Sequence, residues 1–319
     1  MATASTTQER AAELNVLARK QRSLWGDAVY RLFRNKAAVG GLIVIIAAFL
    51  VAAFSGVIAP YNPIEIPASS NLASQMEPLW TGSKYTDSRY LLGTDFLGRD
   101  ILSRLMYASR ISMIVGFIPT SIVFLVGVTV GLTAGFFGGW IDQLLMRFTD
   151  IIYAFPDFLF LLIIVASFRN SPFGKVLDGL ALIFVAIAIV GWVGVARLTR
   201  GQVLALKERE FVEAARSVGA TPGRIMTKHL LPNALAPLIV TAAFAVPNAI
   251  LGEATLSFLG VGIIPPTPSW GGMILEGFPF FSSNPWAVVL PGICISIVML
   301  AFTFVGDGLR DALDPRMKT

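Results

Sequence analysis

The sequence has 319 residues, of which 55% are hydrophobic and only 14% are charged, whereas soluble domains carry about 25% charged residues. Its formal net charge is +5, but the lysines and arginines gather in certain segments between apolar runs, as orientation signals in membrane proteins do. This composition excludes an ordinary soluble domain and argues against nucleic-acid binding, and a lone cysteine, Cys294, with no cluster of cysteine and histidine excludes intrachain disulfides and structural zinc.

Six apolar runs have about the 20-residue length that crosses the hydrocarbon core of a bilayer at 1.5 Å per residue. They cover 38–58, 111–136, 147–168, 180–198, 234–256 and 287–306. The runs predict an all-α membrane protein with six transmembrane helices. The chain thus divides into a cytoplasmic N-terminal tail (1–37), a first transmembrane helix (38–58), an extracytoplasmic segment (59–110), a five-helix core (111–306) that includes a loop at 199–232, and a cytoplasmic C-terminal tail (307–319).

The basic residues predict the orientation of the spans. The N-terminal tail is polar and holds seven lysines and arginines, with no short apolar segment before a cleavage site, so we expect the first span to remain as an anchor. Of the 25 lysines and arginines, 18 lie in the two tails, 137–147 and 197–232, which six spans place on one side. By the positive-inside rule, both termini and the 199–232 loop are expected in the cytoplasm.

Three acidic side chains fall inside predicted spans, where a carboxylate costs roughly 2.5–3.5 kcal/mol on insertion scales. Asp150 lies one turn from Arg147 and can pair with it at i,i+3. Asp157 follows Pro156 and lies deeper, and Glu253 lies near the outer end of the fifth span. Each is a candidate for the lining of a pathway or for a structural role, and none establishes a proton relay.

The aromatic, nearly uncharged stretch 265–286 follows the fifth span. Aromatic side chains concentrate where a membrane meets water, so this stretch is expected at the outer interface as an anchor, or as a gate or a dock for a partner.

The polar loop at 199–232 predicts two short helices. Residues 205–218 are strong helix formers, Gly219 can adopt the left-handed ending conformation, and Thr221-Pro222 supplies an N-cap followed by proline at the first helical position. Such a protruding helix-turn-helix has no core of its own to bury, so it is expected to dock onto a soluble partner.

Two side chains of this loop have simpler interpretations. Glu213 can be an exposed carboxylate paired with Arg209 or Arg216, or it can anchor the loop to a basic residue of a partner. His229 has no second metal-binding side chain nearby, which favours a packing or hydrogen-bonding role.

The loop contains Glu213-Ala214-Ala215, Gly219 and Leu231-Pro232, with His229 and Asn233 on either side of Leu-Leu-Pro. In these residues and their spacing it resembles the EAA loop of bacterial ATP-binding-cassette (ABC) importer permeases, and His229 with Asn233 gives the form typical of peptide-transporter permeases. Three further stretches resemble the same subfamily. They are Leu92-Gly-Thr-Asp95-x-Leu-Gly98-Arg99-Asp100 with Ser103-Arg104-Leu105, Glu253-Ala-Thr-Leu-Ser257-Phe-Leu-Gly260 with Pro265-Pro266 and Pro268-Ser-Trp270-Gly271, and Gly306-Asp307-Gly308-Leu-Arg310-Asp311-Ala-Leu-Asp314-Pro315-Arg316.

The resemblance covers roughly 36–316 and implies a type I importer fold, the second permease subunit of a dipeptide, oligopeptide, nickel or glutathione importer, and a place in the bacterial cytoplasmic membrane. It implies a homologous second permease, two ATP-binding subunits and an extracytoplasmic substrate-binding protein as partners. ATP and Mg²⁺ would be bound by the ATP-binding subunits, and no cofactor by this chain, which lacks a Gly-x-x-x-x-Gly-Lys-Ser/Thr phosphate loop. By the same resemblance, the residues that contact an ATP-binding subunit are Glu213, Ala214, Ala215, Gly219, Ala220, Thr221 and Pro222.

Two other classes of protein remain as alternatives. An ion-coupled secondary transporter or channel would use paired intramembrane charges and often inverted repeats, and the sequence shows few such charges and no visible repeat. An intramembrane enzyme would need a zinc or nucleophile motif, and only one histidine is present. The motifs do not distinguish peptides from nickel chelates, glutathione or opines as the cargo.

Overall fold

The computed structural model describes residues 24–66 and 76–314. The expectations for 1–23, 67–75 and 315–319, which belong to the two tails and the extracytoplasmic segment, lie outside these described residues. Within them the chain is helical, and the only β-structure is an isolated bridge between Thr94 and Asp100. The predicted all-α class is confirmed.

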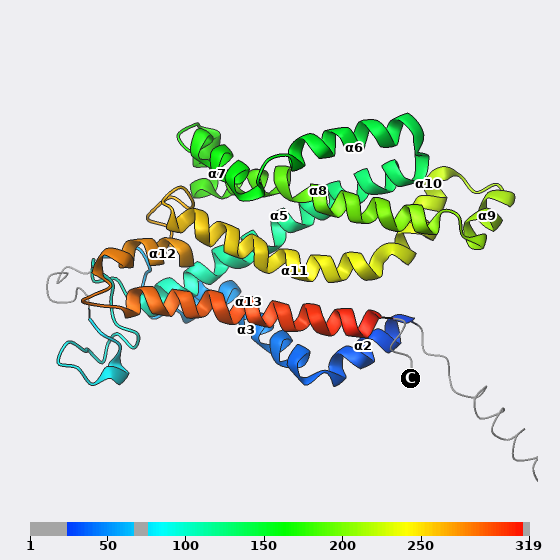
Figure 1. The fold of residues 1–319 in the computed structure, drawn as a ribbon. Coiled ribbons are helices and arrows are strands. Elements are labelled where there is room, and N and C mark those ends of the chain that lie inside the picture. Colours follow the sequence, from blue (N-terminus) through cyan, green and yellow to red (C-terminus); the bar gives the residue numbers. More distant parts are fainter. Residues whose placement is uncertain (1–23, 67–75, 315–319) are drawn as a thin grey trace, which may run out of the picture.

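The helices run mostly side by side (Figure 1). Their bounds are α2 (Leu24–Arg34), α3 (Lys36–Ile58), α5 (Ile101–Phe137), α6 (Gly139–Tyr153), α7 (Asp157–Phe168), α8 (Leu180–Leu206), α9 (Glu210–Ser217), α10 (Pro222–Arg224), α11 (Leu231–Phe258), α12 (Trp270–Gly277) and α13 (Trp286–Leu313). Within 24–66 and 76–314, five stretches of helix are long and apolar enough to cross a membrane, and a sixth is obtained if α6 and α7 count as one broken span. We call the two ends of the bundle the α9 end and the α12 end, after the short helices there (Figure 1).

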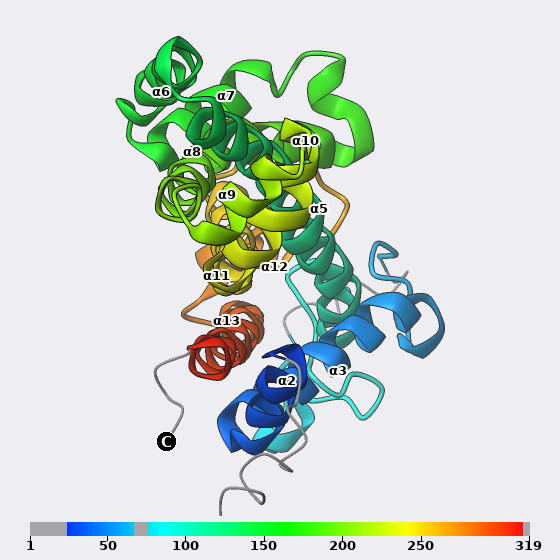
Figure 2. The same ribbon diagram turned by 90° about the vertical axis from the view of Figure 1, so that its right-hand side faces the viewer.

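Seen from the α9 end, the bundle has two groups of helices with α5 and α11 between them (Figure 2). Helices α2, α3 and α13 form one group, and α6, α7 and α8 form the other. Helix α5 crosses α8 closely because its glycines Gly127, Gly131 and Gly135 lie against the α8 backbone and side chains, where a β-carbon would clash. Small residues allow such close approach in membrane helices.

Helix α5 begins at Ile101, ten residues before the predicted start of the second span. Asp100 caps it, because its carboxylate accepts a hydrogen bond from the Ser103 amide at 2.8 Å. The additional turns carry polar and charged residues, but Ile101 and Ala108 are fully buried there. Contacts with protein, rather than lipid, stabilise this part of the helix.

The predicted third span, 147–168, is not one helix. Helices α6 and α7 meet at an angle of 78°, and the break lies at Pro156, which is the N-cap of α7. Proline has no amide hydrogen and disfavours helical geometry in the residue before it, so the α6 helix ends there. The apolar composition continues across the break, which is why the composition alone predicted a single helix.

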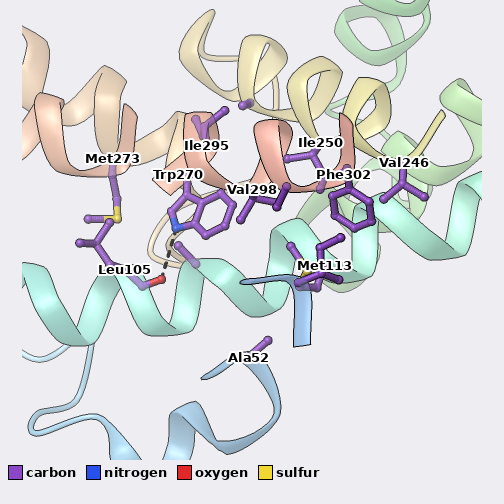
Figure 3. Packing of buried hydrophobic residues seen from close by; sticks show 14 of the residues in the cluster. Ala52, Leu105, Met113, Val246, Ile250, Trp270, Met273, Ile295, Val298 and Phe302 are labelled. Carbon is purple, nitrogen blue, oxygen red and sulfur yellow. Dashed lines mark hydrogen bonds between the residues drawn. The ribbon is translucent and has the colours of Figure 1, made fainter. Parts of the chain in front are cut away.

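The largest buried cluster joins α3, α5, α11, α12 and α13, and Figure 3 shows Trp270 at its centre. Trp270 is 3% exposed, and its indole N–H donates to the Leu105 carbonyl at 3.3 Å. Gly271 lies so close to Ala254 of α11 that no β-carbon would fit. Thus α12, from the stretch expected at the outer interface, inserts Trp270 into the protein core, whereas Trp286 packs edge-on against Trp80 nearby.

Candidate functional site

The loop predicted to dock onto a partner lies at the α9 end of the bundle. Helix α9 packs on the bundle through one face only: Val212 is fully buried and Ala215 is 6% exposed. Both contact a cluster that includes Leu132, Val203 and Ile225, from α5, α8 and the π-helical turn Ile225–Leu230. The inner face therefore fixes α9 to two long helices and to the start of α11.

The outer face of α9 and the turn after it are open to solvent. Glu213, Ala214, Gly219, Thr221 and Pro222 are exposed, and Ala220 is half-buried. Val218 has 84% of its surface exposed. An exposed apolar side chain beside an exposed carboxylate is a surface that a protein partner can cover.

Gly219 ends α9 as the sequence predicted. Its φ is +78°, in the left-handed region that glycine adopts without steric cost. The Gly219 amide donates to the Arg216 carbonyl at 2.9 Å, and the Ala220 amide donates to the Ala215 carbonyl at 3.0 Å. These hydrogen bonds satisfy carbonyls that would otherwise be free at the helix end and fix the direction of the chain after it.

The second predicted short helix does not stand alone. Thr221 occupies the N-cap position and Pro222 the first helical position, although the Thr221 side chain makes no capping hydrogen bond. From Pro222 the chain continues through the π-helical turn into α11, and 222–258 forms one long helix. The loop that is predicted to dock is therefore continuous with a helix long and apolar enough to cross a membrane.

Glu213 forms no ion pair with Arg209 or Arg216 within the described part of the chain, and the Arg216 guanidinium instead lies 6.0 Å from the Phe136 ring centroid. His229 is half-buried and, with Gly219 and Arg224, lines a hollow of about 350 Å³. Its backbone carbonyl accepts a hydrogen bond from the Asn233 side chain at 2.6 Å, and the role of the imidazole stays a prediction.

Asp150 pairs with a residue far along the chain rather than with Arg147. Its carboxylate lies 2.6 Å from the Arg197 guanidinium of α8, and Arg197 also lies over the Tyr153 ring. A second pair, Asp142 with Arg200 at 2.6 Å, connects the same two helices. Asp150 therefore takes part in the attachment of α6 to α8.

Glu253 reaches neither interfacial water nor an open path in this structure, because it is fully buried. The Ser257 hydroxyl donates to its Oε1 at 2.6 Å, while Oε2 has no hydrogen-bond partner among the described residues. Ser257 in turn accepts from the Ile263 amide at 3.1 Å. Glu253 thus belongs to the packing between the end of α11 and the turn that follows it.

Asp157 is exposed and is the first residue of α7. It lies in a groove of about 410 Å³ whose walls come from α5, α7, α8 and α11. Of the three acidic candidates, Asp157 alone lines an open space in the membrane-spanning part of the bundle. We call this hollow the central groove.

A cluster of four charges at the α12 end was not predicted as a unit. Arg99 lies 2.7 Å from Asp95 and 2.6 Å from Glu276, and Arg104 lies 3.1 Å and 2.7 Å from the same two carboxylates. Arg99, Arg104 and Asp95 are buried. The cluster attaches the stretch before α5 to α12. Beside the cluster, burial raises the pKa of Asp100, although the two hydrogen bonds from Ser103 act in the opposite direction and lower it.

Two family models match the chain. One, described as the inner membrane component of binding-protein-dependent transport systems, covers residues 127–319. The other, described as the N-terminal transmembrane domain of oligopeptide transport permease C, covers 23–76.

Relatives match over nearly the whole chain. A dipeptide transport system permease protein of Alkalihalophilus pseudofirmus is 41% identical over 93% of this chain and 91% of its own length. An oligopeptide transport system permease protein of Bacillus subtilis is 38% identical over 97% of this chain and 95% of its own. Among solved structures, an inward-facing form of the MetNI methionine ABC transporter aligns over 66% of this chain and 96% of its own, with a TM-score of 0.52 and 21% identity, which is a likeness of fold.

Proposed function

The chain belongs to the family of inner membrane components of binding-protein-dependent transport systems, and we propose that it forms half of the translocation pathway of an ABC importer for dipeptides or oligopeptides. The relatives that match over about nine-tenths of the chain are peptide permeases by name. Their similarity covers both the membrane helices and the loop around α9, so the cargo class is carried over from them.

In this proposal, the coupling of transport to ATP hydrolysis depends on the loop at 199–232, which contains α9. Its partners are a homologous second permease, two ATP-binding subunits that hold ATP and Mg²⁺, and an extracytoplasmic binding protein. The outer face of α9, with Glu213, Ala214 and Val218, docks onto an ATP-binding subunit. This proposal is supported chiefly by the geometry of the loop: its outer face is exposed, while its inner face packs on α5, α8 and the start of α11.

Because α10 continues into α11, a push on the loop is transmitted along a helix that crosses the membrane. Movement of an ATP-binding subunit then tilts α11 and alters the pathway. The same proposal places the α9 end and both termini in the cytoplasm and the α12 end outside, where the binding protein delivers its cargo.

Site-directed cross-linking tests the docking. In a chain whose lone Cys294 is replaced by serine, Ala214→Cys labelled with a thiol-reactive photo-cross-linker is expected to cross-link to the ATP-binding subunit of the assembled importer on illumination, because Ala214 lies on the exposed face of α9. Val57→Cys is the matched control. Val57 is 83% exposed but lies in the last turn of α3, at the α12 end of the bundle, so this variant is expected to give no such product. An intact assembly without the Ala214 product would refute docking through this face.

A further inference from the structure

We propose that Asp157 binds the α-ammonium group of a peptide as it crosses the membrane, and that the central groove is this chain's part of the pathway. This inference rests on the proposed function, since it requires the cargo to be a peptide. Beyond that function, it identifies the chemical group of the cargo that the permease itself recognises.

The central groove lies near the middle of the membrane. Helix α5 contributes Thr120 and Val123, close to the midpoint of Ile101–Phe137. The contributions of α8 and α11 likewise come from the central turns of those long helices. Three spans therefore bring their midpoints to one open space, and α7 begins there.

Among the described residues, Asp157 is the only charged one that lines the groove. It is exposed, and its carboxylate forms no hydrogen bond or ion pair with any described residue, unlike the carboxylate of Asp150 in the same broken span. An ionised carboxylate at this depth is costly unless water or a cation accompanies it. The groove thus has a negative group that the chain itself leaves uncompensated.

The break before Asp157 supports the same interpretation. Backbone that leaves the helical path at membrane depth is tolerated only where protein covers it or where it lines a water-filled cavity. The bend of 78° between α6 and α7 lies directly before Asp157 and Phe158, which line the groove. The break therefore presents the first residue of α7 to the cavity.

The shape of the groove leaves room for a ligand. Gly194 of α8 and Gly252 of α11 both line it, and a β-carbon at either position would have no atom within 4 Å. Asn248 of α11 is exposed in the same groove and offers an amide oxygen as a second acceptor. Small residues that line the same groove as a carboxylate and an amide leave room for a compact cation.

The α-ammonium group is the cation that every peptide with a free N-terminus carries, whatever its side chains. A lone carboxylate recognises this shared group without selecting a sequence, and it repels the peptide's own C-terminal carboxylate. A metal ion fits less well, because the described residues contain no group of three histidine, cysteine, aspartate or glutamate side chains. The charge and the chemistry of the groove thus favour an ammonium ligand.

The alternative role for Asp157 is to stabilise the first turn of α7 through the helix dipole. Asp157→Asn removes the charge and therefore both roles, so a comparison of peptides with a free and a blocked N-terminus separates them: a helix-stabilising role would not distinguish the two peptides. Asp157→Glu keeps the charge. Asp150→Asn is the control, since it makes the same change in the same broken span outside the groove and breaks only an exposed ion pair with Arg197, which contributes little.

Uptake is measured in proteoliposomes that hold the complete importer, supplied with unchanged, dialanine-loaded binding protein. Asp157→Asn is expected to lower the number of dialanine molecules taken up per ATP hydrolysed by about tenfold or more, the scale of losing a hydrogen bond to a charged group. Asp157→Glu and Asp150→Asn are expected to stay near the wild-type ratio. A wild-type ratio for Asp157→Asn would overturn the proposal.

A binding assay on the importer without its binding protein tests the ammonium group itself. Unlabelled dialanine is expected to displace labelled dialanine from the wild-type importer at least about tenfold better than N-acetyl-dialanine, and Asp157→Asn is expected to abolish this difference. Equal displacement by the two peptides from the wild type would overturn the proposal. So would uptake that requires a proton gradient in the wild type and loses that requirement in Asp157→Asn, because Asp157 would then carry a proton.

Filling the groove gives an independent test. Gly252→Leu places a side chain in the open space and is expected to reduce uptake about tenfold, whereas Gly292→Leu in α13, where a β-carbon also meets no atom within 4 Å, is the control and is expected to retain it. Normal uptake by Gly252→Leu would show that the pathway lies elsewhere. A wild-type assembly that takes up no peptide would instead refute the proposed function.

Discussion

Replacement of Gly219 by valine is expected to abolish peptide uptake and to reduce stimulated ATP hydrolysis strongly while the chain still inserts in the membrane. The φ of +78° at Gly219 costs an L-residue roughly 1–2 kcal/mol, and a β-branched side chain is especially disfavoured there. No atom lies within 4 Å of a β-carbon at this site, so the effect arises from the backbone conformation and not from a clash.

The strain at residue 219 acts on a short element. Helix α9 has eight residues and is held by Val212 and Ala215, so relief of the strain by unwinding its last turn removes Ala215 from its contacts. The outer face of α9 then loses its position relative to α11. We expect at least about a tenfold loss of binding-protein-stimulated hydrolysis, the scale of 1.4 kcal/mol, measured in reconstituted importer at equal protein levels.

Two variants control for this result. Gly219→Asn is expected to retain most activity, because asparagine enters the left-handed region more readily than other residues with a side chain. Gly223→Ala changes a glycine four residues away that has ordinary helical geometry and open space around it, and it is expected to behave as wild type. Normal uptake by Gly219→Val would contradict the proposal that the loop transmits movement of the ATP-binding subunit to α11.

Replacement of Arg104 by methionine is expected to cause the largest loss of stability. The Arg104 side chain is 1% exposed and lies between Asp95 and Glu276. Without it, Arg99 alone faces both carboxylates, and breaking a buried ion pair by removing one partner costs about 3–5 kcal/mol. The expected result is a clearly lower midpoint of thermal unfolding in detergent, because the attachment of α12 to the start of α5 is weakened.

The control for Arg104 is an ion pair of similar length at the surface. Arg89 lies 2.6 Å from Asp87, but its side chain is 66% exposed, and exposed pairs contribute little. Arg89→Ala is therefore expected to leave the unfolding midpoint nearly unchanged. Arg104→Lys is expected to fall between the two, because an ammonium group cannot reproduce the planar fork of a guanidinium. Equal midpoints for Arg104→Met and wild type would show that the charge cluster does not support the fold.

The sequence predicted those features that depend on local pattern. Apolar runs of span length correspond to α3, α5, α8, α11 and α13, because burial in lipid imposes one requirement on many consecutive residues. Gly219 was predicted to end a helix, and it does so with positive φ, since few other residues adopt that conformation. The start of α5 at Ile101 was missed because protein contacts replace lipid contacts there.

Features that depend on distant residues were not predictable in this way. Arg104 and Glu276 are 172 positions apart, and Asp150 pairs with Arg197 across 47 positions although Arg147 is nearer in sequence. The break at Pro156 escaped notice because apolar composition continues through it, and Asp157 could be placed in a groove only once α5, α8 and α11 were seen around it. A pattern along one chain does not contain these contacts.

The most direct measurement of the proposed function compares the chain purified alone with the chain reconstituted together with the second permease and the ATP-binding subunits, with and without peptide-loaded binding protein. In the complete assembly, we expect ATP hydrolysis that is stimulated by loaded binding protein and accompanied by peptide uptake. The chain alone is expected to show neither hydrolysis nor uptake. Peptide flux through the lone chain, driven by an ion gradient and independent of ATP, would contradict the account and identify a secondary transporter.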